Sequence, residues 1–289
     1  MYVRVAVMMV IGLYTSRVVL NVLGVEDYGT YNVVGGVVSM FSLLTASMSG
    51  SISRYLTFSL GKGDKEQLRR VFCVSVEGQL FLAVVIVLAV EAVGVWFLNT
   101  QMKIPDGRLV AANWVMQCTL ISFVVDLLMV PYNASIISHE RMNIYAYISI
   151  WDAVMKLVIV YALYVSPFDK LETYAVLLLL VSTLTTIIYW IYCRRHFEEC
   201  HFSVVKDKAL IKEMSSFAGW GMIGDGAWML NTQGVNILMN LFFGVVLNAA
   251  RGVATTVDNV VQGFVRNFMV ALNPQIVKSY AEGDYEYMH

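Results

Sequence analysis

The sequence predicts an all-α polytopic membrane protein, and three observations support this fold class. Hydrophobic residues make up 58% of the 289 residues and charged residues 14%, with a mean hydropathy of +0.66, outside the composition of soluble domains. Residues 28–53 and 173–193 carry no charged side chain, so each is long enough to cross a hydrocarbon core of about 30 Å as a helix. The periodicity is helical, and the alternating short segments of outer-membrane barrels are absent.

Eight transmembrane helices follow from grouping the uncharged windows. The first window follows one basic residue, as in a signal peptide, but it has no cleavage motif and Arg17 interrupts it, so we expect a retained helix. The predicted spans are 2–23, 29–53, 71–98, 110–137, 143–165, 173–193, 216–243 and 246–272.

Lysine and arginine are concentrated in alternate connections, 54–70, 138–142 and 194–213, and the tail carries Lys278. The other connections, 24–28, 99–109 and 166–172, are poor in positive charge. The positive-inside rule therefore predicts a multi-pass membrane protein with its N-terminus in the cytoplasm.

An internal repeat is indicated at an offset of 220 residues, which aligns Gly24 with Gly244 and the pair Gly63-Asp64 with Gly283-Asp284. The offset pairs helices 1 and 2 with helices 7 and 8, and two such lobes are common among transporters. We expect a six-helix N-terminal lobe over 1–193, a cytoplasmic linker over 194–215, and the first two helices of a C-terminal lobe over 216–289. By this logic the second lobe should continue for four more helices, so the chain is expected to be a fragment or a truncated product.

A polar stripe runs along the last predicted helix, because steps of three and four residues place its polar side chains on one face. It consists of Arg251, Thr255, Asp258, Gln262 and Arg266. Charges facing lipid would be costly, so the stripe should face protein or water. Three interpretations remain open: an internal Arg251–Asp258 ion pair, a cavity that admits an anionic solute, and snorkelling of Arg266.

Helix 1 adds Arg17 and Asn21, one turn apart, as further candidates for a substrate-binding cavity, although helix–helix hydrogen bonding explains polar residues there equally well. In helix 5, Asp152 and Lys156 have the spacing of an ion pair. Lone acids also lie in the spans, and of these Glu91 and Asp126 are the candidates for binding a coupling proton or Na⁺.

Hinge candidates are Pro131, which should kink or break helix 4, and Gly221 and Gly224 in the glycine-rich start of helix 7. The glycines could equally be close-packing points between helices. Both features suit a protein that moves between two conformations.

No catalytic motif is found, so the sequence does not predict an enzyme, and no cofactor or resident metal is expected. The four cysteines are scattered, as expected of free thiols. Cys193, His196, Cys200 and His201 form a cluster that could hold zinc, but the spacing fits no common site.

The chain resembles the polysaccharide-exporter branch of the multidrug and oligosaccharidyl-lipid flippase superfamily, which is MATE-like and includes O-antigen flippases. The segments that carry the resemblance are GLYTSRVVLNVLGVEDYGTYNVVGGVV at 12–38, VPYNASIISHERMNIYAY at 130–147, and NTQGVNILMNLFFG, NAARG and NPQIVKSYAEGD within 231–284. The resemblance covers nearly the whole chain. The resemblance implies a protein of the inner membrane with twelve to fourteen helices, so a chain of eight helices departs from the branch.

The resemblance implies an alternating-access flippase for a polyprenyl-pyrophosphate-linked oligosaccharide in surface polysaccharide biosynthesis, such as lipopolysaccharide O-antigen. It implies the lipid-linked oligosaccharide, the bilayer, a glycan polymerase and glycosyltransferases as partners, and no nucleic acid. Arg17, Arg251 and Arg266 stand where the branch places cavity cations. The alternatives are a Na⁺- or H⁺-coupled multidrug antiporter of the same superfamily and a truncated membrane protein that transports nothing.

Overall fold

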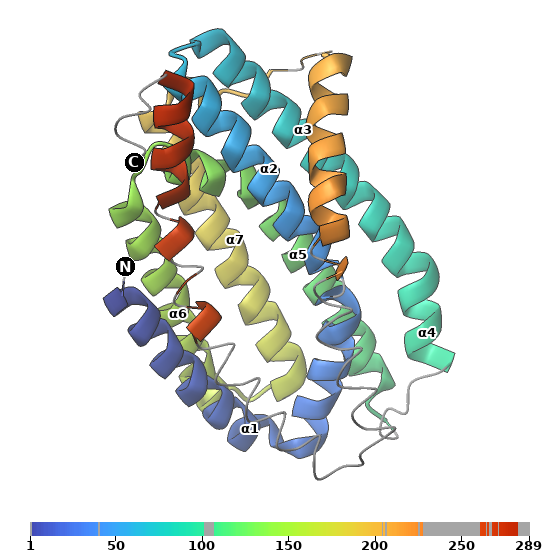
Figure 1. The fold of residues 1–289 in the computed structure, drawn as a ribbon. Helices are drawn as coiled ribbons and strands as arrows, with labels where there is room; N and C mark the ends of the chain where they lie inside the picture. Colours follow the sequence, from blue (N-terminus) through green and yellow to red (C-terminus); the bar gives the residue numbers. More distant parts are fainter. Residues whose placement is uncertain are drawn as a thin grey trace, which may run out of the picture.

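The computed structural model describes residues 2–39, 41–100, 107–203, 205, 207–224, 226–227, 261–263, 265, 268–270 and 272–282. Every regular element in these ranges is a helix, and the helices form a single bundle (Figure 1). Four of them are long and apolar enough to cross a membrane: Lys65–Thr100, Leu109–Ser138, Met142–Val165 and Lys170–His196. The predicted all-α class is confirmed.

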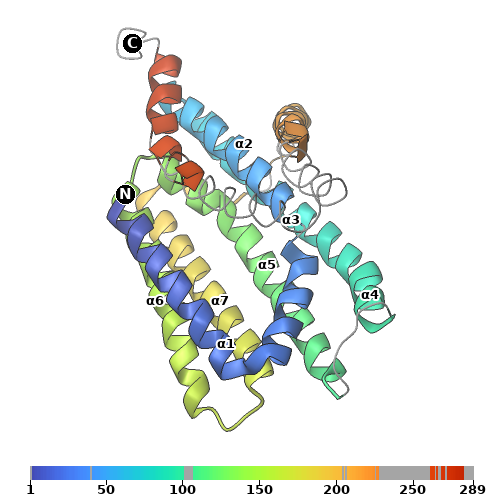
Figure 2. The same cartoon turned by 60° about the horizontal axis from the view of Figure 1, so that its bottom comes forward.

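The first two predicted spans meet at a sharp reversal of the chain. Helix α1 (Tyr2–Ser39) contains a non-helical residue, Gly24, with φ 79° and ψ 171°. Only glycine adopts such a conformation at little cost. The two parts of α1 consequently run in opposite directions (Figures 1 and 2), which confirms the predicted connection at 24–28.

The second span is two helices, the later part of α1 and then α2 (Ser42–Gly61). A short turn leads to α3 (Lys65–Ala89), where Asp64 caps the new helix by accepting a hydrogen bond of 2.9 Å from the amide of Gln67. Helix α3 continues through a π-helical turn, Val90–Gly94, into α4 (Val95–Thr100). Helices α2 and α3 extend beyond the predicted spans. The spans were drawn from uncharged windows, whereas the helices continue into the charged residues that flank those windows.

The next three helices are α5 (Leu109–Ser138), α6 (Met142–Val165) and α7 (Lys170–His196), followed by a short 3-10 turn, Glu198–Cys200. Their bounds lie within three residues of the predicted spans. Helix α5 is central and contacts α1, α2, α3, α6 and α7. Three buried apolar clusters hold the bundle together, and they include Phe72 and Ile136, Leu98 and Met116, and Val19 and Leu163 respectively.

The outer surface of the bundle is apolar. Phe81 and Leu88 on α3 are 71% and 65% exposed, and large apolar side chains on α5, α6 and α7 are also exposed, including Trp114, Tyr147 and Leu180. In water such a surface would be unfavourable, whereas in a bilayer it contacts lipid chains. Together with the four apolar helices, this surface marks a multi-pass membrane protein.

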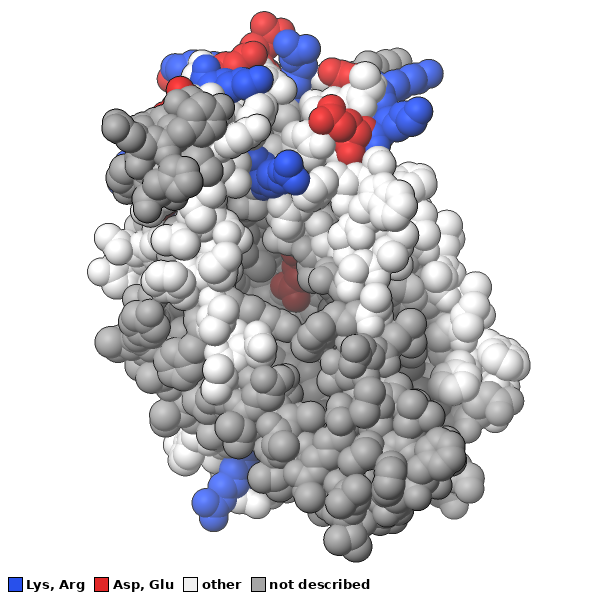
Figure 3. Space-filling view, viewed as in Figure 1, with Lys and Arg blue, Asp and Glu red and all other residues white. Residues whose placement is uncertain are grey.

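Charged side chains gather at one end of the bundle, where the α2–α3 turn lies (Figure 3). The connections after α2, α5 and α7, which carry the predicted Lys and Arg clusters, meet there, and we call it the basic end. The predicted alternation of basic and non-basic connections therefore corresponds to the two ends of the bundle. The assignment of the basic end to the cytoplasm stays a prediction.

A helix over residues 208–224 packs against α2. The Ser51 hydroxyl donates to the Met214 carbonyl at 3.2 Å, the Tyr55 hydroxyl donates to Glu213 at 3.0 Å, and the Arg54 guanidinium lies 4.5 Å from the ring centroid of Phe217. The helix begins eight residues before the predicted span at 216, because its first two turns carry the charged residues Lys208, Lys212 and Glu213. Asp207 begins the helix by accepting a hydrogen bond from the Leu210 amide at 3.0 Å.

The last described helix, 272–282, contacts the basic end of the bundle. Lys278 lies 3.8 Å from Glu140 in the α5–α6 turn, and Ser279 is buried. A methyl group on Gly61 would lie 2.7 Å from the Ala281 Cβ and 2.8 Å from the Lys278 carbonyl oxygen. Gly61 thus permits a close approach between this helix and the end of α2.

Replacing Gly61 with alanine should lower stability by about 1 kcal/mol, since the added methyl overlaps helix 272–282. The matched control is Gly50→Ala in the same helix, where nothing lies within 4 Å of the added carbon. Gly50→Ala should instead raise stability by about 0.5 kcal/mol, as expected for alanine in a helix. Thermal unfolding in detergent measures both. Equal stabilisation by the two variants would mean that the contact is not made.

Most of the predicted C-terminal lobe, including all of residues 228–260, lies outside the described residues. The total of eight helices, the 220-residue repeat and the lobe boundaries at 193 and 216 therefore stay predictions.

Candidate functional site

A polar cavity of 760 Å³ lies inside the bundle between α1, α2, α5, α6 and α7. Figure 3 shows a hollow at mid-height of the bundle with an acidic side chain at depth. Polar groups of this density inside a bilayer-spanning bundle are costly unless they serve a pathway or site. The polar lining consists of Tyr31, Thr45, Ser49, Thr119, Ser122, Asp126, Asn133, Tyr145, Ser149, Asp152, Lys156, Ser182, Thr185 and Tyr189.

Asp126 on α5 is exposed to this cavity in an otherwise apolar stretch of helix. It accepts a hydrogen bond of 2.5 Å from the Ser182 hydroxyl on α7. One turn further along α7, the Thr186 hydroxyl donates to the Val125 carbonyl at 3.5 Å, so two polar contacts join the helices here. A carboxylate held in place at a cavity wall is suited to exchange a proton or bind a cation.

The predicted ion pair on α6 is confirmed, because Lys156 Nζ lies 2.8 Å from Asp152 Oδ2. Both side chains line the cavity, and the Lys156 side chain is 49% exposed. With Asp126, the cavity wall therefore carries two carboxylates and one ammonium group. Among the described residues, the cavity lining is therefore acidic on balance.

Two buried polar atoms at this cavity have no hydrogen-bond partner among the described residues, namely Asn133 Oδ1 and Thr185 Oγ1. Buried polar atoms are nearly always paired with protein or with ordered water. These atoms therefore indicate that the cavity is built to hold water or a polar guest rather than an apolar chain.

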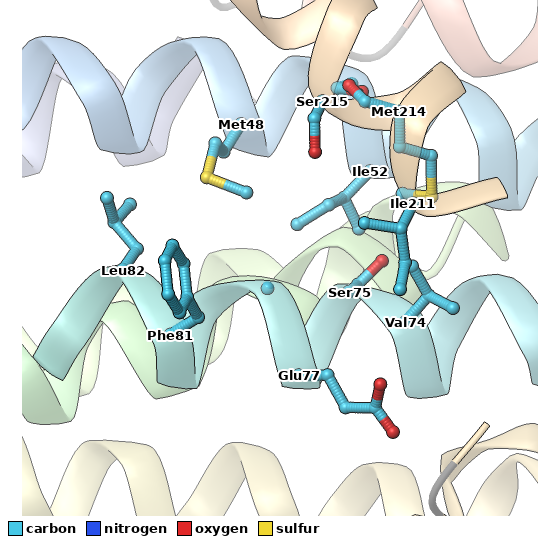
Figure 4. A pocket seen from close by; sticks show the side chains of 12 residues that line it. Met48, Ile52, Val74, Ser75, Glu77, Phe81, Leu82, Ile211, Met214 and Ser215 are labelled. Atoms are coloured by element: carbon cyan, nitrogen blue, oxygen red, sulfur yellow. The ribbon is translucent and has the colours of Figure 1, made fainter. Parts of the chain in front are cut away.

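A second cavity, of 430 Å³, lies between α2, α3 and helix 208–224 and is mostly apolar (Figure 4). Met48, Ile52, Phe81 and Met214 line it, and the Glu77 side chain points away from the other labelled side chains. Glu77 Oε1 accepts a hydrogen bond of 2.9 Å from the Val205 amide, so this carboxylate holds the loop before helix 208–224. The cavity has few groups that could bind a polar solute.

An ion cluster closes the end of the bundle opposite to the basic end. Arg108 donates to Asp27 at 2.6 Å and to Asp169, and Asp169 also caps α7 by accepting from the Leu171 amide at 2.9 Å. Asp27 follows the Gly24 reversal, Arg108 precedes α5 and Asp169 precedes α7, so the cluster joins three connections of the described bundle at this end. The sequence analysis missed it, since its members are 61 and 81 residues apart.

The two acids of this cluster titrate differently. Burial raises the pKa of Asp27, against the attraction of Arg108. Burial also opposes ionisation of Asp169, but hydrogen bonds from Arg108 and from backbone amides outweigh it and lower the pKa of Asp169. The stability that Asp169 contributes is therefore present at neutral pH and is lost as pH falls below about 4 through its lowered pKa.

Replacing Arg108 with glutamine should destabilise the bundle by about 2–3 kcal/mol, because Asp27 is then buried without a counter-charge. The expected loss of stability is smaller than for a fully buried ion pair, since the Arg108 side chain is 34% exposed and solvent partly screens its charge. Thermal unfolding at pH 7 measures the loss.

Lys170→Gln is the matched control, because it removes a nearby exposed cation that only contacts the Val22 carbonyl at 3.5 Å. Combining Arg108→Gln with Asp27→Asn should recover part of the loss, since the unpaired charge disappears. A double variant as unstable as Arg108→Gln would contradict this explanation.

The predicted cavity residues are only partly described. Arg17 and Asn21 are exposed on α1 and line none of the three described cavities. Gln262 is exposed in a helical turn, whereas Arg251, Thr255, Asp258 and Arg266 lie outside the described residues. Of the two ion-coupling candidates, Asp126 lines the polar cavity, while Glu91 is exposed in the π-helical turn and does not.

Pro131 does not break α5, which runs without interruption from Leu109 to Ser138. The predicted kink at Pro131 and its role as a hinge stay predictions. The Ser135 hydroxyl, one turn further along the helix, donates to the Pro131 carbonyl at 3.0 Å. Gly221 and Gly224 are helical too, and Gly221 faces Ser47, with 3.8 Å between an added Cβ and the Ser47 side chain. The packing interpretation therefore fits Gly221, and its role as a hinge stays a prediction.

The four cysteines are free thiols and buried. In the part of the chain that the structure describes, no three His, Cys, Asp or Glu side chains come together as metal ligands. His196 and His201 are instead bound through Nδ1 to the carbonyls of Tyr192 and Glu198, at 2.9 and 3.1 Å.

Solved structures match the chain over nearly its whole length, whereas no curated protein matches it. A MATE structure in the straight conformation aligns with a TM-score of 0.79 and 15% identity, covering 98% of this chain and 63% of that one. An outward-facing multidrug resistance MATE transporter of the MOP superfamily gives 0.74 and 16%, covering 98% and 63%. A MOP superfamily transporter from Pyrococcus furiosus gives 0.69 and 15%, covering 96% and 62%.

These likenesses show the MATE-like fold that the resemblance implied. The chain spans less than two thirds of the length of each of these structures. The family described as polysaccharide biosynthesis protein matches residues 3–279. The match covers the helices that build the polar cavity, and the chain therefore belongs to the polysaccharide biosynthesis protein family.

Proposed function

We propose that this protein is a transporter that moves a polyprenyl-pyrophosphate-linked oligosaccharide across the inner membrane by alternating access. The observation that carries the proposal is the polar cavity enclosed by α1, α2, α5, α6 and α7 in a member of a polysaccharide biosynthesis family. Its unpaired atoms at Asn133 and Thr185 favour a polar guest. The prenyl tail would stay in the lipid that contacts the apolar outer surface.

The two lobes would bind ions of opposite charge. The described cavity carries Asp126 and Asp152 against Lys156, so it suits a coupling proton or Na⁺. The stripe predicted in the last span carries Arg251 and Arg266 against Asp258, and it suits the pyrophosphate. Arg17 would add a third cation toward the same anion.

The proposed setting is surface polysaccharide biosynthesis, such as that of lipopolysaccharide O-antigen. A glycosyltransferase that completes the lipid-linked oligosaccharide would act before this step, and a glycan polymerase would act on the exported product. Both are proposed partners, together with the bilayer itself.

The second candidate is a Na⁺- or H⁺-coupled multidrug antiporter, and the acidic lining of the described cavity favours it because carboxylates attract cationic drugs. One matched structure is a multidrug resistance transporter. For the Pyrococcus furiosus transporter, reversed polarity of the binding pocket suggests a different function. The sign of the charge that contacts the solute is therefore the property to test.

The test is reconstitution of the full chain in proteoliposomes that contain a fluorescent polyprenyl-pyrophosphate-linked oligosaccharide. A membrane-impermeant quencher then reports its movement between leaflets. Movement well above that in protein-free vesicles is expected, with no uptake of the cationic dye ethidium under a proton or Na⁺ gradient. Dye transport without lipid movement would establish the antiporter, and transport of neither would support the non-transporting alternative.

A further inference from the structure

The basic end of the bundle holds a third cavity, of 610 Å³, which is separate from the polar cavity. It lies between the end of α2, the start of α3, the turn after α5 and the end of α7. Its charged lining consists of Lys65, Arg69 and Arg141 with Glu66, Glu198 and Glu199. Nothing in the proposed transport cycle uses these residues.

Each carboxylate of this lining already has a partner. Glu66 lies 3.2 Å from Arg70, one turn further along α3, and Glu198 lies 2.9 Å from Lys65. Glu199 is buried, and its Oε1 lies 2.5 Å from His139 Nε2. No carboxylate of the lining is therefore left to attract a further cation.

Arg69 and Arg141 differ from Lys65, the third cation that the described lining carries. Both are exposed, and among the described residues no carboxylate lies within ion-pair distance of either. Two guanidinium groups on the wall of one cavity, neither of them in an ion pair with a described carboxylate, are available to bind an anion there. A planar guanidinium matches the oxygens of a phosphate group better than any other side chain.

The wall between these arginines is preformed. The His139 ring stacks on Phe197 with centroids 4.0 Å apart and planes 6° from parallel. His196 stacks on Tyr192 at 4.2 Å, and its Nδ1 donates to the Tyr192 carbonyl at 2.9 Å. A ligand therefore meets side chains that are already held in place.

We propose that this cavity binds a phosphate group between Arg69 and Arg141, at the boundary between the bundle and water. The phosphate can belong to a lipid headgroup or to a soluble phosphate compound, because both present the same oxygens. The site does not depend on the proposed transport function, since binding here requires no movement of a solute across the membrane.

The test uses the full chain and two probes. Inorganic pyrophosphate is titrated calorimetrically into the protein in a neutral detergent. In parallel, energy transfer from tryptophan to dansyl-labelled phosphatidic acid is measured in nanodiscs of phosphatidylcholine. The variant is Arg69→Gln with Arg141→Gln, and the matched control is Arg194→Gln with Arg195→Gln, which removes two exposed arginines of the same end outside the cavity.

Binding of at least one probe should weaken by about tenfold or more in Arg69→Gln/Arg141→Gln and by less than about twofold in the control. An effect on pyrophosphate alone identifies a soluble phosphate as the source, and an effect on phosphatidic acid alone identifies a lipid headgroup. Equal effects of the two double variants, or no binding of either probe, would overturn the proposal. Thermal unfolding of each variant shows whether it remains folded, and single variants at Arg69 and Arg141 repeat the test if the double variant does not.

Discussion

Replacing Arg17 and Arg251 together with alanine is expected to abolish movement of the lipid-linked oligosaccharide, while the protein continues to be produced and to reach the membrane. The two guanidinium groups are proposed to hold the pyrophosphate, and a dianion in a low-dielectric cavity cannot be held without counter-charges. The measurement is the proteoliposome assay described above, with the amount of inserted protein determined for each variant.

The matched control for this prediction is Arg194→Ala with Arg195→Ala, which removes the same charge from the exposed end of α7. The control should retain most of the activity. Replacing Arg17 and Arg251 with lysine should preserve part of it, since the charge stays and only the paired hydrogen bonds are lost. Full activity in Arg17→Ala/Arg251→Ala would show that neither residue contacts the substrate.

Asp126→Asn is expected to reduce coupled transport by about tenfold or more, because the amide cannot exchange a proton or balance a bound cation. The variant keeps the size of the side chain, and its amide can still pair with Ser182 on α7, so the bundle should remain folded. Transport is measured with and without an imposed proton or Na⁺ gradient. The wild type should respond to one of the gradients, and the variant to neither.

Glu91→Gln is the matched control for Asp126→Asn, because it neutralises the other candidate acid. Glu91 is exposed in the π-helical turn and does not line the polar cavity. The Glu91→Gln variant should therefore still respond to the proton or Na⁺ gradient. A loss of response in Glu91→Gln together with a normal response in Asp126→Asn would reverse the assignment.

Helices of uniform apolar composition were predictable from the sequence. The spans 110–137, 143–165 and 173–193 agree within three residues with α5, α6 and α7, because lipid requires every backbone group to be paired within the helix. Helix ends in water were less predictable. Gly61, Lys65 and Lys208 mark ends that lie beyond the apolar windows, since hydropathy detects the membrane-embedded part alone.

Contacts between distant segments could not be predicted in the same way. Asp126 was selected as a lone acid, but its pairing with Ser182 depends on the packing of α5 against α7. The cluster around Arg108 left only a weak signal, a lone arginine next to a span in a connection otherwise poor in positive charge. Its two partners are identified only when the fold brings the three connections to one end.

That cluster has a mechanical consequence. A transporter that rocks between two states needs lobes that keep their shape while the angle between them changes. Arg108 joins the reversal at Gly24, the start of α5 and the start of α7, so three helices that line the polar cavity are held together at one end. We therefore expect α1, α5 and α7 to move as one rigid body. Bending should be confined to segments that the cluster does not hold.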